Sequence, residues 1–476
     1  MNDRSLFDSQ DGLAGGLAGF LWFCLAMIAG ATVAFLIFPA GMLLGSPSYW
    51  ENVLSDTTTG IVAYYEFVHD QWRWPILYTP LFDSPDGALI YYADPNPLLA
   101  ILGKIAFKLT GKIYLYTGPW LLASYMLNAG FGYIILRHLR LGVLTALPAS
   151  LLFVLMPEFL FRFPHLPLSG QFTIVASIYA YLRITSGVHR VEVVLWAIAI
   201  GLLTFVTPYI LAMCVPLLFA ALLDGAWRKR VSFTLIVVGM SILLLEVLLL
   251  AWVGGLLEGS FPRSGGFTDY SMNLLSPVWP QFSLLSWTPG FLLATPGQYE
   301  GYNYLGIGTL ALIVLAVVFG RGDIWRLVRE RPFYLLSLWM FFIYSLSSVV
   351  YLGYILLMTM HYEDFPVLSE ITGILRAPGR FFWPVGYSWL IGAVVILHRS
   401  KLSRMLPAIL VTAVVAQAIE LTPLYRNMQR GAAISQVADK SAIASAIDKH
   451  TELRFFPGFR CAKQGRGYPI LAFQVV

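Results

Sequence analysis

Residues 193–223, VVLWAIAIGLLTFVTPYILAMCVPLLFAALL, decide how this chain is threaded through a membrane. The run contains no charged residue, and Pro208 stands at its middle. A helix that spans a bilayer needs about 20 apolar residues, each of which adds about 1.5 Å to its length. A run of 31 residues is therefore too long for one straight span and short for two. The number of its crossings fixes the side on which every later loop lies.

Similar apolar runs recur along the whole chain. Of its 476 residues, 58% are apolar and only 12% are charged, whereas a soluble domain has about a quarter charged residues. Most of the surface must therefore face lipid. Nine further runs are candidate spans: 13–38, 114–136, 142–160, 170–184, 231–256, 305–320, 333–356, 381–397 and 405–422. The sequence predicts an all-α polytopic membrane protein.

The positive-inside rule resolves the run 193–223. If the run crosses twice, ten basic residues lie in the cytoplasm and three lie outside, whereas a single crossing inverts this ratio. The ten are Arg228, Lys229, Arg230, Arg321, Arg326, Arg329, Arg331, Arg399, Lys401 and Arg404, and the three are Arg263, Arg376 and Arg380. We therefore predict eleven spans in the inner (plasma) membrane, with a cytoplasmic N-terminus and a periplasmic or extracellular C-terminus.

Two segments outside the spans are expected to fold. In the long first outer loop, residues 40–112, three lysines spaced by four (Lys104, Lys108 and Lys112) mark one face of an amphipathic helix that lies in the membrane interface. The predicted membrane module covers residues 1–422. The short extracytoplasmic C-terminal segment, 423–476, is predicted to be a small α+β unit, with a helix over 435–450 and strands over 452–456 and 468–476.

Charge and motif content exclude several classes of function. The net charge of +5 comes from short basic clusters between apolar runs, which is typical of membrane topology and argues against a nucleic-acid partner. The three cysteines provide no disulfide framework, because two of them lie inside apolar runs. The sequence has no Walker A, GxGxxG or zinc-spaced His/Cys motif and does not indicate ATP use or a structural metal.

The first outer loop is unusually acidic for a segment beside a membrane span. Asp56, among aromatic residues, is a candidate general base that would deprotonate an acceptor hydroxyl, or it caps the helix that starts near Thr57. Asp94 directly precedes the amphipathic helix and either caps that helix or has a site role, as a candidate substrate-binding residue. Asp83 and Asp86, in the sequence DSPDG, are predicted turn formers. The loop holds seven of the 26 acids: Glu51, Asp56, Glu66, Asp70, Asp83, Asp86 and Asp94.

Two later outer loops carry further candidates for substrate binding. Arg162 and His165 stand three residues apart in the connection after the third candidate span. They would contact a phosphate, because arginine offers a planar fork of donors. Alternatively, they are a snorkelling arginine and a capping histidine. Glu300, in the sequence QYEGYNY, belongs either to a sugar-binding surface or to an aromatic belt at the membrane interface.

The last two candidates for substrate binding run against the topological charge bias. Arg376 and Arg380 are arginines on the outer side, so they would bind a lipid-linked phosphate at the membrane surface or pair with acids such as Asp56 or Glu363. Glu246 lies in the middle of an apolar run. Intramembrane acids are costly and indicate function by default. A proton path or an interhelical hydrogen bond would explain it, and we favour a protonated structural residue.

Taken together, these segments resemble the polytopic GT-C glycosyltransferases and, within that group, a family of uncharacterised bacterial integral membrane proteins. The resemblance spans about 330 residues in matching order. It rests on Trp50, Ser55-Asp56, Trp72-Arg-Trp-Pro75, Asp94-Pro-Asn-Pro97, Arg162-Phe-Pro-His165, Asn273-Leu-Leu-Ser-Pro277, Gln298-Tyr-Glu-Gly301, Tyr304-Leu-Gly306 and Arg376–Arg380. Two departures are Ser55, where glycine is more usual, and the short C-terminal segment.

The resemblance implies a GT-C-like fold and an inverting glycosyltransferase. Such an enzyme moves a sugar from a polyprenyl-phosphate-linked donor to a glycan, lipid or protein acceptor on the extracytoplasmic face. The first-loop acid of these enzymes matches Asp56, as base or as ligand to an assisting divalent cation, Mg²⁺ or Mn²⁺. Two alternatives remain open: a lipid-linked glycan transporter or flippase, which would need basic residues lining a cavity, and an O-antigen-type polymerase or ligase.

Overall fold

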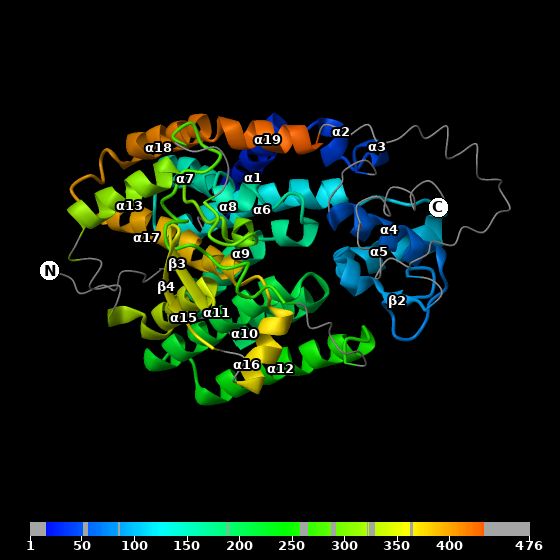
Figure 1. Cartoon of the computed structure of the whole chain (residues 1–476). Coiled ribbons are helices and arrows are strands. Elements are labelled where there is room, and N and C mark those ends of the chain that lie inside the picture. The colour runs from blue at the N-terminus through cyan, green and yellow to red at the C-terminus, as the bar shows by residue number, and fades with distance from the viewer. Residues whose placement is uncertain are drawn as a thin grey trace.

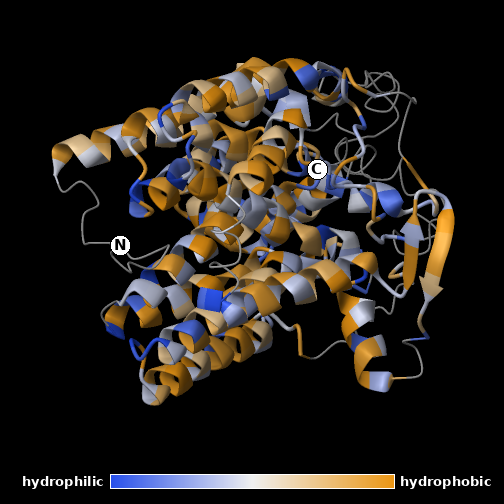
Figure 2. Ribbon diagram, turned by 90° about the vertical axis from the view of Figure 1, so that its left-hand side faces the viewer, coloured by the Kyte–Doolittle hydropathy of each residue, from blue (hydrophilic) through white to orange (hydrophobic). Residues whose placement is uncertain are grey.

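A bundle of helices makes up most of the molecule (Figure 1). The computed structural model describes residues 16–50, 56–83, 86–187, 190–257, 265–286, 292–320, 322, 329–361 and 365–432. Strands in these residues form two small antiparallel pairs. The helix and strands expected after residue 434 lie outside the described residues. Hydrophobic residues make up much of the helices (Figure 2), and many of the large ones are exposed.

Each of the eleven predicted spans contains a helix. They are α1 (Leu17–Ile37), α6 (Thr117–His138), α7 (Val143–Val154), α9 (Phe172–Ser186), α10 (Arg190–Gly201), α11 (Pro208–Trp227), α12 (Phe233–Val253), α13 (Ile307–Phe319), α15 (Pro332–Leu346), α17 (Trp383–Arg399) and α18 (Leu406–Glu420). Within the described residues, five helical stretches are long and apolar enough to cross a membrane. A sixth is added if α18 and α19 (Thr422–Ala432), bent by 47°, form one span. The chain is a helical membrane protein.

The run 193–223 forms two helices, as predicted. Helix α10 ends at Gly201, a 3-10 turn η3 (Leu202–Phe205) follows, and α11 begins at Pro208. Proline suits this first helical position because its missing N–H would have no partner there and its φ is already helical. The two helices pack against different neighbours, α10 against α12 and α11 against α9. Pro208 therefore divides the run into two separately packed helices.

The prediction of one helix over 333–356 is wrong in its second half. Helix α15 ends at Leu346, and the chain turns at Ser347, whose φ is 67°. A hairpin of β3 (Val349–Leu352) and β4 (Ile355–Thr359) follows, with a bulge between Val350 and Tyr351. The Ser347 hydroxyl donates to the carbonyl of Phe267, 2.7 Å away. The second half of the run contains β-branched residues, which are as hydrophobic as those of a membrane span but favour a β-strand. Hydropathy alone therefore predicted a helix where a hairpin forms.

The first outer loop is well structured. It contains α2 (Ala40–Leu43), α3 (Pro47–Trp50), α4 (Asp56–His69), β1 (Tyr78–Thr79), β2 (Ala88–Leu89), η1 (Ile90–Ala93) and α5 (Pro97–Thr110). Helices α4 and α5 lie together at the right-hand end of the molecule in Figure 1. Gly60 of α4 allows a close approach, since a Cβ there would lie 3.1 Å from the Ala93 carbonyl oxygen and 3.3 Å from that of Asp94. This contact brings the first turn of α4 beside Asp94.

Helix α5 confirms the predicted amphipathic helix but not its basic face. Lys108 and Lys112 are exposed, whereas Lys104 is buried. The Lys104 ammonium donates to the Gln71 carbonyl, 3.0 Å away, and lies 3.9 Å from the ring centroid of Phe67. An ammonium over an aromatic face is stabilised by the ring quadrupole. Lys104 thus fastens α5 to α4 and is not available to a phosphate at the surface.

The remaining short elements bring the outer loops to the ends of the helices. They are α8 (Pro157–Leu160), η2 (Leu166–Ser169), η4 (Gln298–Gly301), α16 (Pro366–Ile374) and η6 (Pro378–Phe382). Turns η4 and η6 touch through glycine, because a Cβ on Gly379 would lie 2.6 Å from the Cα of Gly301. The Gly379 N–H donates to the Tyr270 carbonyl at 3.0 Å. Glycines in QYEG and RAPGR therefore bring Glu300 next to Arg380.

Candidate functional site

Residues from four separate segments form one ionic cluster. Asp56 begins α4, Arg162 and His165 lie between α8 and η2, Glu300 lies in η4, and Arg380 lies in η6. These are five of the seven site residues predicted from the sequence. The charge of Asp94 also acts on Arg380, whereas Arg376 is placed differently. The structure thus brings together residues separated by more than 300 positions in the chain.

Glu300 is the centre of the cluster and is buried between two arginines. Its Oε2 lies 2.5 Å from Nη1 of Arg162 and 3.0 Å from Nε of Arg380. Arg162 also donates to the Glu300 carbonyl at 2.8 Å. Burial alone would raise the pKa of Glu300, but the charges of Arg380 and Arg162 outweigh it and hold the pKa well below its ordinary range. Glu300 is therefore ionised at neutral pH.

Burial of these groups overturns two interpretations of the sequence. Arg162 is completely buried, and its guanidinium lies 5.5 Å from the ring centroid of Trp383. It does not snorkel. Glu300 is likewise buried and does not belong to an exposed aromatic belt. The pairing alternative is correct for Arg380, although its acid is Glu300 and not Asp56; Glu363 lies outside the described residues.

His165 connects the buried pair to an exposed acid. Its Nδ1 lies 3.2 Å from Oδ2 of Asp56, and its Nε2 lies 3.6 Å from Oε1 of Glu300. The side chain of Asp56 is 74% exposed and that of His165 is 21% exposed. The hydrogen bond with His165 lowers the pKa of Asp56 below its ordinary value. Asp56 is therefore an ionised carboxylate that is open to solvent and held in place from one side.

The start of α4 is fastened to the His165 turn by a second contact. The hydroxyl of Thr57 donates to the carbonyl of Pro164 at 2.6 Å. Because Thr57 and Pro164 directly follow and precede Asp56 and His165, this bond fixes the two side chains relative to each other. The helix predicted to start near Thr57, with Asp56 as its cap, starts one residue earlier, so Asp56 is its first residue; position 55, which would hold the cap, lies outside the described residues.

Asp94 is not the cap of α5. That role belongs to Asn96, whose Oδ1 accepts from the Leu99 N–H at 3.5 Å. Asp94 has a φ of 55° and lies in the turn before the helix. Burial raises its pKa to about 6, although the charges of His165 and Arg380 oppose this shift. Asp94 therefore belongs to the electrostatic surroundings of the cluster and changes charge near neutral pH.

Arg376 lies outside the Glu300 cluster. It is exposed, and its guanidinium lies 5.6 Å from the ring centroid of Tyr270. The ring of Tyr270 contacts that of Tyr299 edge-on, at a centroid distance of 6.4 Å, and Tyr299 directly precedes Glu300. Two tyrosines thus separate Arg376 from the buried cluster. This leaves Arg376 available for a ligand that approaches from solvent.

Sequence reasoning missed Tyr209 and Glu158. Tyr209 follows Pro208 in α11, its ring lies 4.4 Å from the Arg380 guanidinium, and its hydroxyl accepts from the Ala377 N–H at 3.2 Å. The helix break at Pro208 was the available signal for Tyr209. Glu158 is fully buried in α8, and neither carboxyl oxygen has a hydrogen-bond partner among the described residues. No feature of the sequence marked Glu158 as a site residue, apart from its place in the same loop as Arg162.

The other predicted acids take structural places. Asp83 and Asp86 lie in turns, as predicted, and Asp83 has a φ of 60°. Glu246 of α12 packs against Gly201 of α10, where a Cβ would lie 2.3 Å from Oε2. That oxygen is buried and has no hydrogen-bond partner among the described residues. Oε2 of Glu246 therefore makes no interhelical hydrogen bond within the described residues.

A double-mutant cycle on Arg162 and Glu300 tests whether the buried pair holds the cluster together. Removing one partner of a buried ion pair costs about 3–5 kcal/mol because the other charge is left uncompensated. We expect Glu300→Gln and Arg162→Gln each to lower the free energy of unfolding, measured in detergent by SDS titration, with a coupling energy above about 1 kcal/mol.

The control cycle uses Arg183 and Glu192, a partly exposed pair with N–O contact at 2.6 Å. An exposed pair contributes about 0–1 kcal/mol, so its coupling energy should be the smaller of the two. Equal coupling in both cycles would contradict the central role of Glu300.

Comparison with known proteins gives one match. No curated protein and no solved structure matches the chain significantly. The family model described as Domain of unknown function (DUF6311) matches residues 27–422, from the middle of α1 to the start of α19. This range includes every residue of the cluster around Glu300. The chain therefore belongs to the DUF6311 family.

Proposed function

We propose that this protein is an inverting glycosyltransferase of the GT-C type. It would move a sugar from a polyprenyl-phosphate-linked donor to a glycan, lipid or protein acceptor on the extracytoplasmic face of the membrane. The observation that carries the proposal is the exposed carboxylate of Asp56, held 3.2 Å from His165 and backed by Arg380 and Arg162 through Glu300. An ionised acid beside cations at the ends of membrane helices suits transfer from a lipid phosphate.

In the proposed reaction, Asp56 acts as the general base. Its carboxylate takes the proton of an acceptor hydroxyl, and the hydroxyl oxygen forms a bond to the anomeric carbon of the sugar. The bond between that carbon and the phosphate oxygen breaks, and its electron pair leaves with the phosphate. Attack opposite the leaving group inverts the anomeric carbon. One carboxylate suffices, because a phosphate departs without prior protonation, whereas a retaining enzyme needs a second close carboxylate as nucleophile.

The leaving phosphate needs positive charge at the surface. The charge of Arg380 acts on Asp56, and Arg380 is only partly buried. Arg376 is exposed, and arginine pairs well with phosphate oxygens. Arg162 and Glu300 are buried, so we assign them as positioning residues that orient Arg380 and His165. Asp94 would accept hydrogen bonds from sugar hydroxyls when it is ionised.

A divalent cation fits this site in one way. No group of three or more His, Cys, Asp and Glu side chains in the described residues is arranged to hold a metal ion. Mg²⁺, however, binds through one or two carboxylates together with substrate phosphate. As the alternative to its role as base, Asp56 would hold it, since its carboxylate is exposed to solvent. A bound cation would offset the negative charge of the donor phosphate.

Replacement of Asp56 tests the proposed base. Asp56→Asn keeps the size of the side chain but removes its basicity. General-base catalysis contributes about 10²–10⁴-fold to a rate, so we expect sugar transfer from a polyprenyl-phosphate sugar to a panel of acceptors to fall by at least 100-fold. Asp86→Asn, in the exposed turn of the same loop, is the matched control and should transfer sugar at the wild-type rate.

Two outcomes of this assay would contradict the mechanism. Transfer by Asp56→Asn at the wild-type rate would exclude Asp56 as the base. Export of a lipid-linked glycan without any covalent product would instead indicate the transporter alternative.

The pH dependence tests the role of Asp94. Its pKa is raised to about 6, so its carboxyl is neutral below that pH and ionised above it. If the ionised form binds the sugar, kcat/KM should rise as the pH passes through about 6 and then level off. Asp94→Asn should be slower and should lack this rise, measured as transfer rates between pH 5 and 8. A rise that persists in Asp94→Asn would assign the pKa to another group.

The proposal requires eleven spans, with a cytoplasmic N-terminus and an outer C-terminus. Labelling of single cysteines with an impermeant maleimide in whole cells tests this topology, in a background in which Cys24, Cys214 and Cys461 are replaced. We expect Asp86→Cys, in the first outer loop, to be labelled in intact cells. Lys401→Cys, in the predicted cytoplasmic loop, should react only after permeabilisation. Labelling of Lys401→Cys in intact cells would show that the topology is wrong.

A further inference from the structure

The hairpin of β3 and β4 exposes apolar side chains on both of its faces. All five residues of β4 are exposed. Successive residues of a strand point to opposite faces, so the exposed side chains of Leu356 and Leu357 lie on different sides of the hairpin. Figure 2 shows both strands at the right-hand edge of the molecule, outside the helix bundle. A rigid protein partner would cover one face of such a hairpin and leave the other in water.

Helix α16 presents its apolar face away from the protein. Val367, Ile371 and Ile374 recur at intervals of four and three residues and so share one face of the helix, and they are 72%, 43% and 40% exposed. The residue of α16 that is buried is the polar Thr372. An amphipathic helix of a soluble domain has the opposite orientation, with its apolar stripe facing the core. The orientation of α16 is typical of a helix that lies in the interface of a membrane.

Both elements lie at the same end of the molecule as the Glu300 cluster. The side-chain amide of Asn273 donates to the Gly353 carbonyl in the hairpin turn at 2.7 Å and to Oε1 of Gln298 at 3.4 Å. Gln298 belongs to the same turn, η4, as Glu300. The chain that leaves α16 runs directly into η6, which carries Arg380. The exposed apolar surface of the hairpin and α16 is therefore fixed beside the candidate site.

The lipid-facing surface of the bundle continues into this hairpin. Helix α15, a predicted span, exposes the apolar side chains of Trp339, Met340 and Ile343, which lipid would cover. Because β3 begins directly after the turn at Ser347 that ends α15, the hairpin lies at the surface of the same bilayer. The exposed Arg376 follows α16 at the second residue after its end. A cation at this position complements the phosphates at a membrane surface.

We propose that β4 and α16 insert into the membrane leaflet on the side of the Glu300 cluster. Their apolar side chains would lie among the first carbons of the lipid chains, with Arg376 at the level of the lipid phosphates. The outer edge of β4 pairs with no other strand in the described residues. At this depth its backbone finds hydrogen-bond partners in headgroups and water, which the hydrocarbon core does not offer. The insertion is independent of sugar transfer, although it would place Arg376 within reach of a lipid-linked phosphate.

Spin labels on single cysteines test whether these side chains contact lipid. The full chain, with its own cysteines replaced, would be reconstituted into vesicles of phosphatidylglycerol and phosphatidylethanolamine. Collisions of each label are measured with oxygen, which concentrates in lipid, and with nickel ethylenediaminediacetate, which stays in water. The test variants are Leu356→Cys, Leu357→Cys and Ile371→Cys. All three side chains are exposed, so the substitutions leave the packing of the bundle unchanged.

Three control variants set the scale. Val314→Cys, at an exposed apolar position of α13, is the lipid control, and Asp86→Cys, in an exposed turn of the first outer loop, is the water control. Glu370→Cys is matched to Ile371→Cys, because neighbouring residues stand about 100° apart around a helix. We expect the ratio of oxygen to nickel collisions at all three test positions to approach that at Val314→Cys and to exceed that at Asp86→Cys. The ratio at Glu370→Cys should be lower than at Ile371→Cys.

Two results would overturn the proposal. A ratio at the test positions as low as that at Asp86→Cys would place the surface in water. Exclusion of both reagents from Leu356→Cys or Leu357→Cys would show that another protein surface covers the hairpin. Magnetic broadening between labels on different copies would then identify the covering surface as a second copy of this chain.

Discussion

The shared ion pair of Glu300 with Arg162 and Arg380 is the constraint on which the candidate site and the loops around it depend. A charge taken out of water is costly unless it is paired and hydrogen-bonded. Arg162 can be fully buried only if Glu300 reaches it, and Glu300 can be buried only between its two arginines. The pairing therefore locks together three segments that lie 80 and 138 residues apart in the chain.

The consequences of this pairing reach the exposed acid one step at a time. With Glu300 fixed, its second carboxylate oxygen faces His165, whose other ring nitrogen faces Asp56. Three carboxyl groups in one small region thus have three different environments. Glu300 is buried and paired, Asp94 is partly buried with a raised pKa, and Asp56 is exposed with a lowered pKa. A base needs an ionised carboxylate that substrate can reach, and Asp56 meets both conditions most fully, because it is the most exposed of the three and its pKa is lowered.

Local pattern predicted much of this fold but none of its long-range pairings. Runs of apolar residues located eleven helices, and Pro208 located the break in 193–223, because span length and proline geometry act locally. The prediction of a helix over 347–356 was wrong, because a short apolar run can form either a strand or a helix and hydropathy does not distinguish them. The sequence predicted that Asp94 either caps α5 or has a site role, whereas the residue that caps α5 is Asn96. The partner of Arg162, in contrast, stands 138 residues away, and one sequence carries no information about it.

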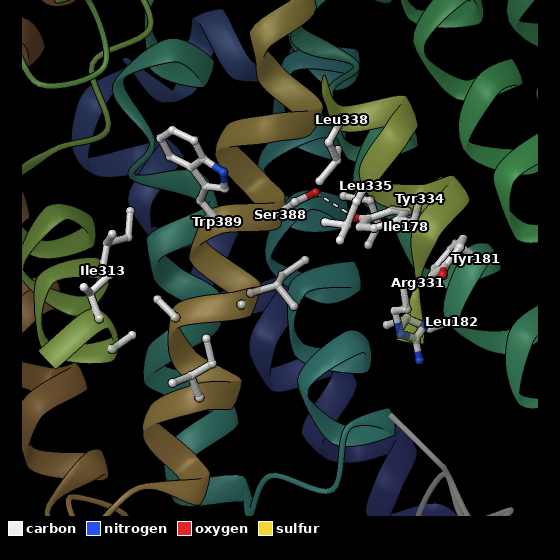
Figure 3. Close-up of a pocket in the computed structure, with 16 residues that line it drawn as sticks. Ile178, Tyr181, Leu182, Ile313, Arg331, Tyr334, Leu335, Leu338, Ser388 and Trp389 are labelled. Carbon is white, nitrogen blue, oxygen red and sulfur yellow. Dashed lines mark hydrogen bonds between the residues drawn. The ribbon is translucent and has the colours of Figure 1, made fainter. Parts of the chain in front are cut away.

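Helix α17 connects the Glu300 cluster with an apolar cavity that lies between α9, α13, α15 and α17 (Figure 3). Arg380 stands just before its start, and Gly392 opens onto the cavity in its second half. Between them lies Gly386, where a Cβ would be 2.6 Å from a carboxyl oxygen of Glu158. A buried carboxyl without hydrogen-bond partners in the described residues opposes stability. Departures from local consistency concentrate at functional sites. Glu158 lies four residues before Arg162 and packs on α17. This position supports the interpretation that the buried polar groups around the cluster are there for function and not for stability.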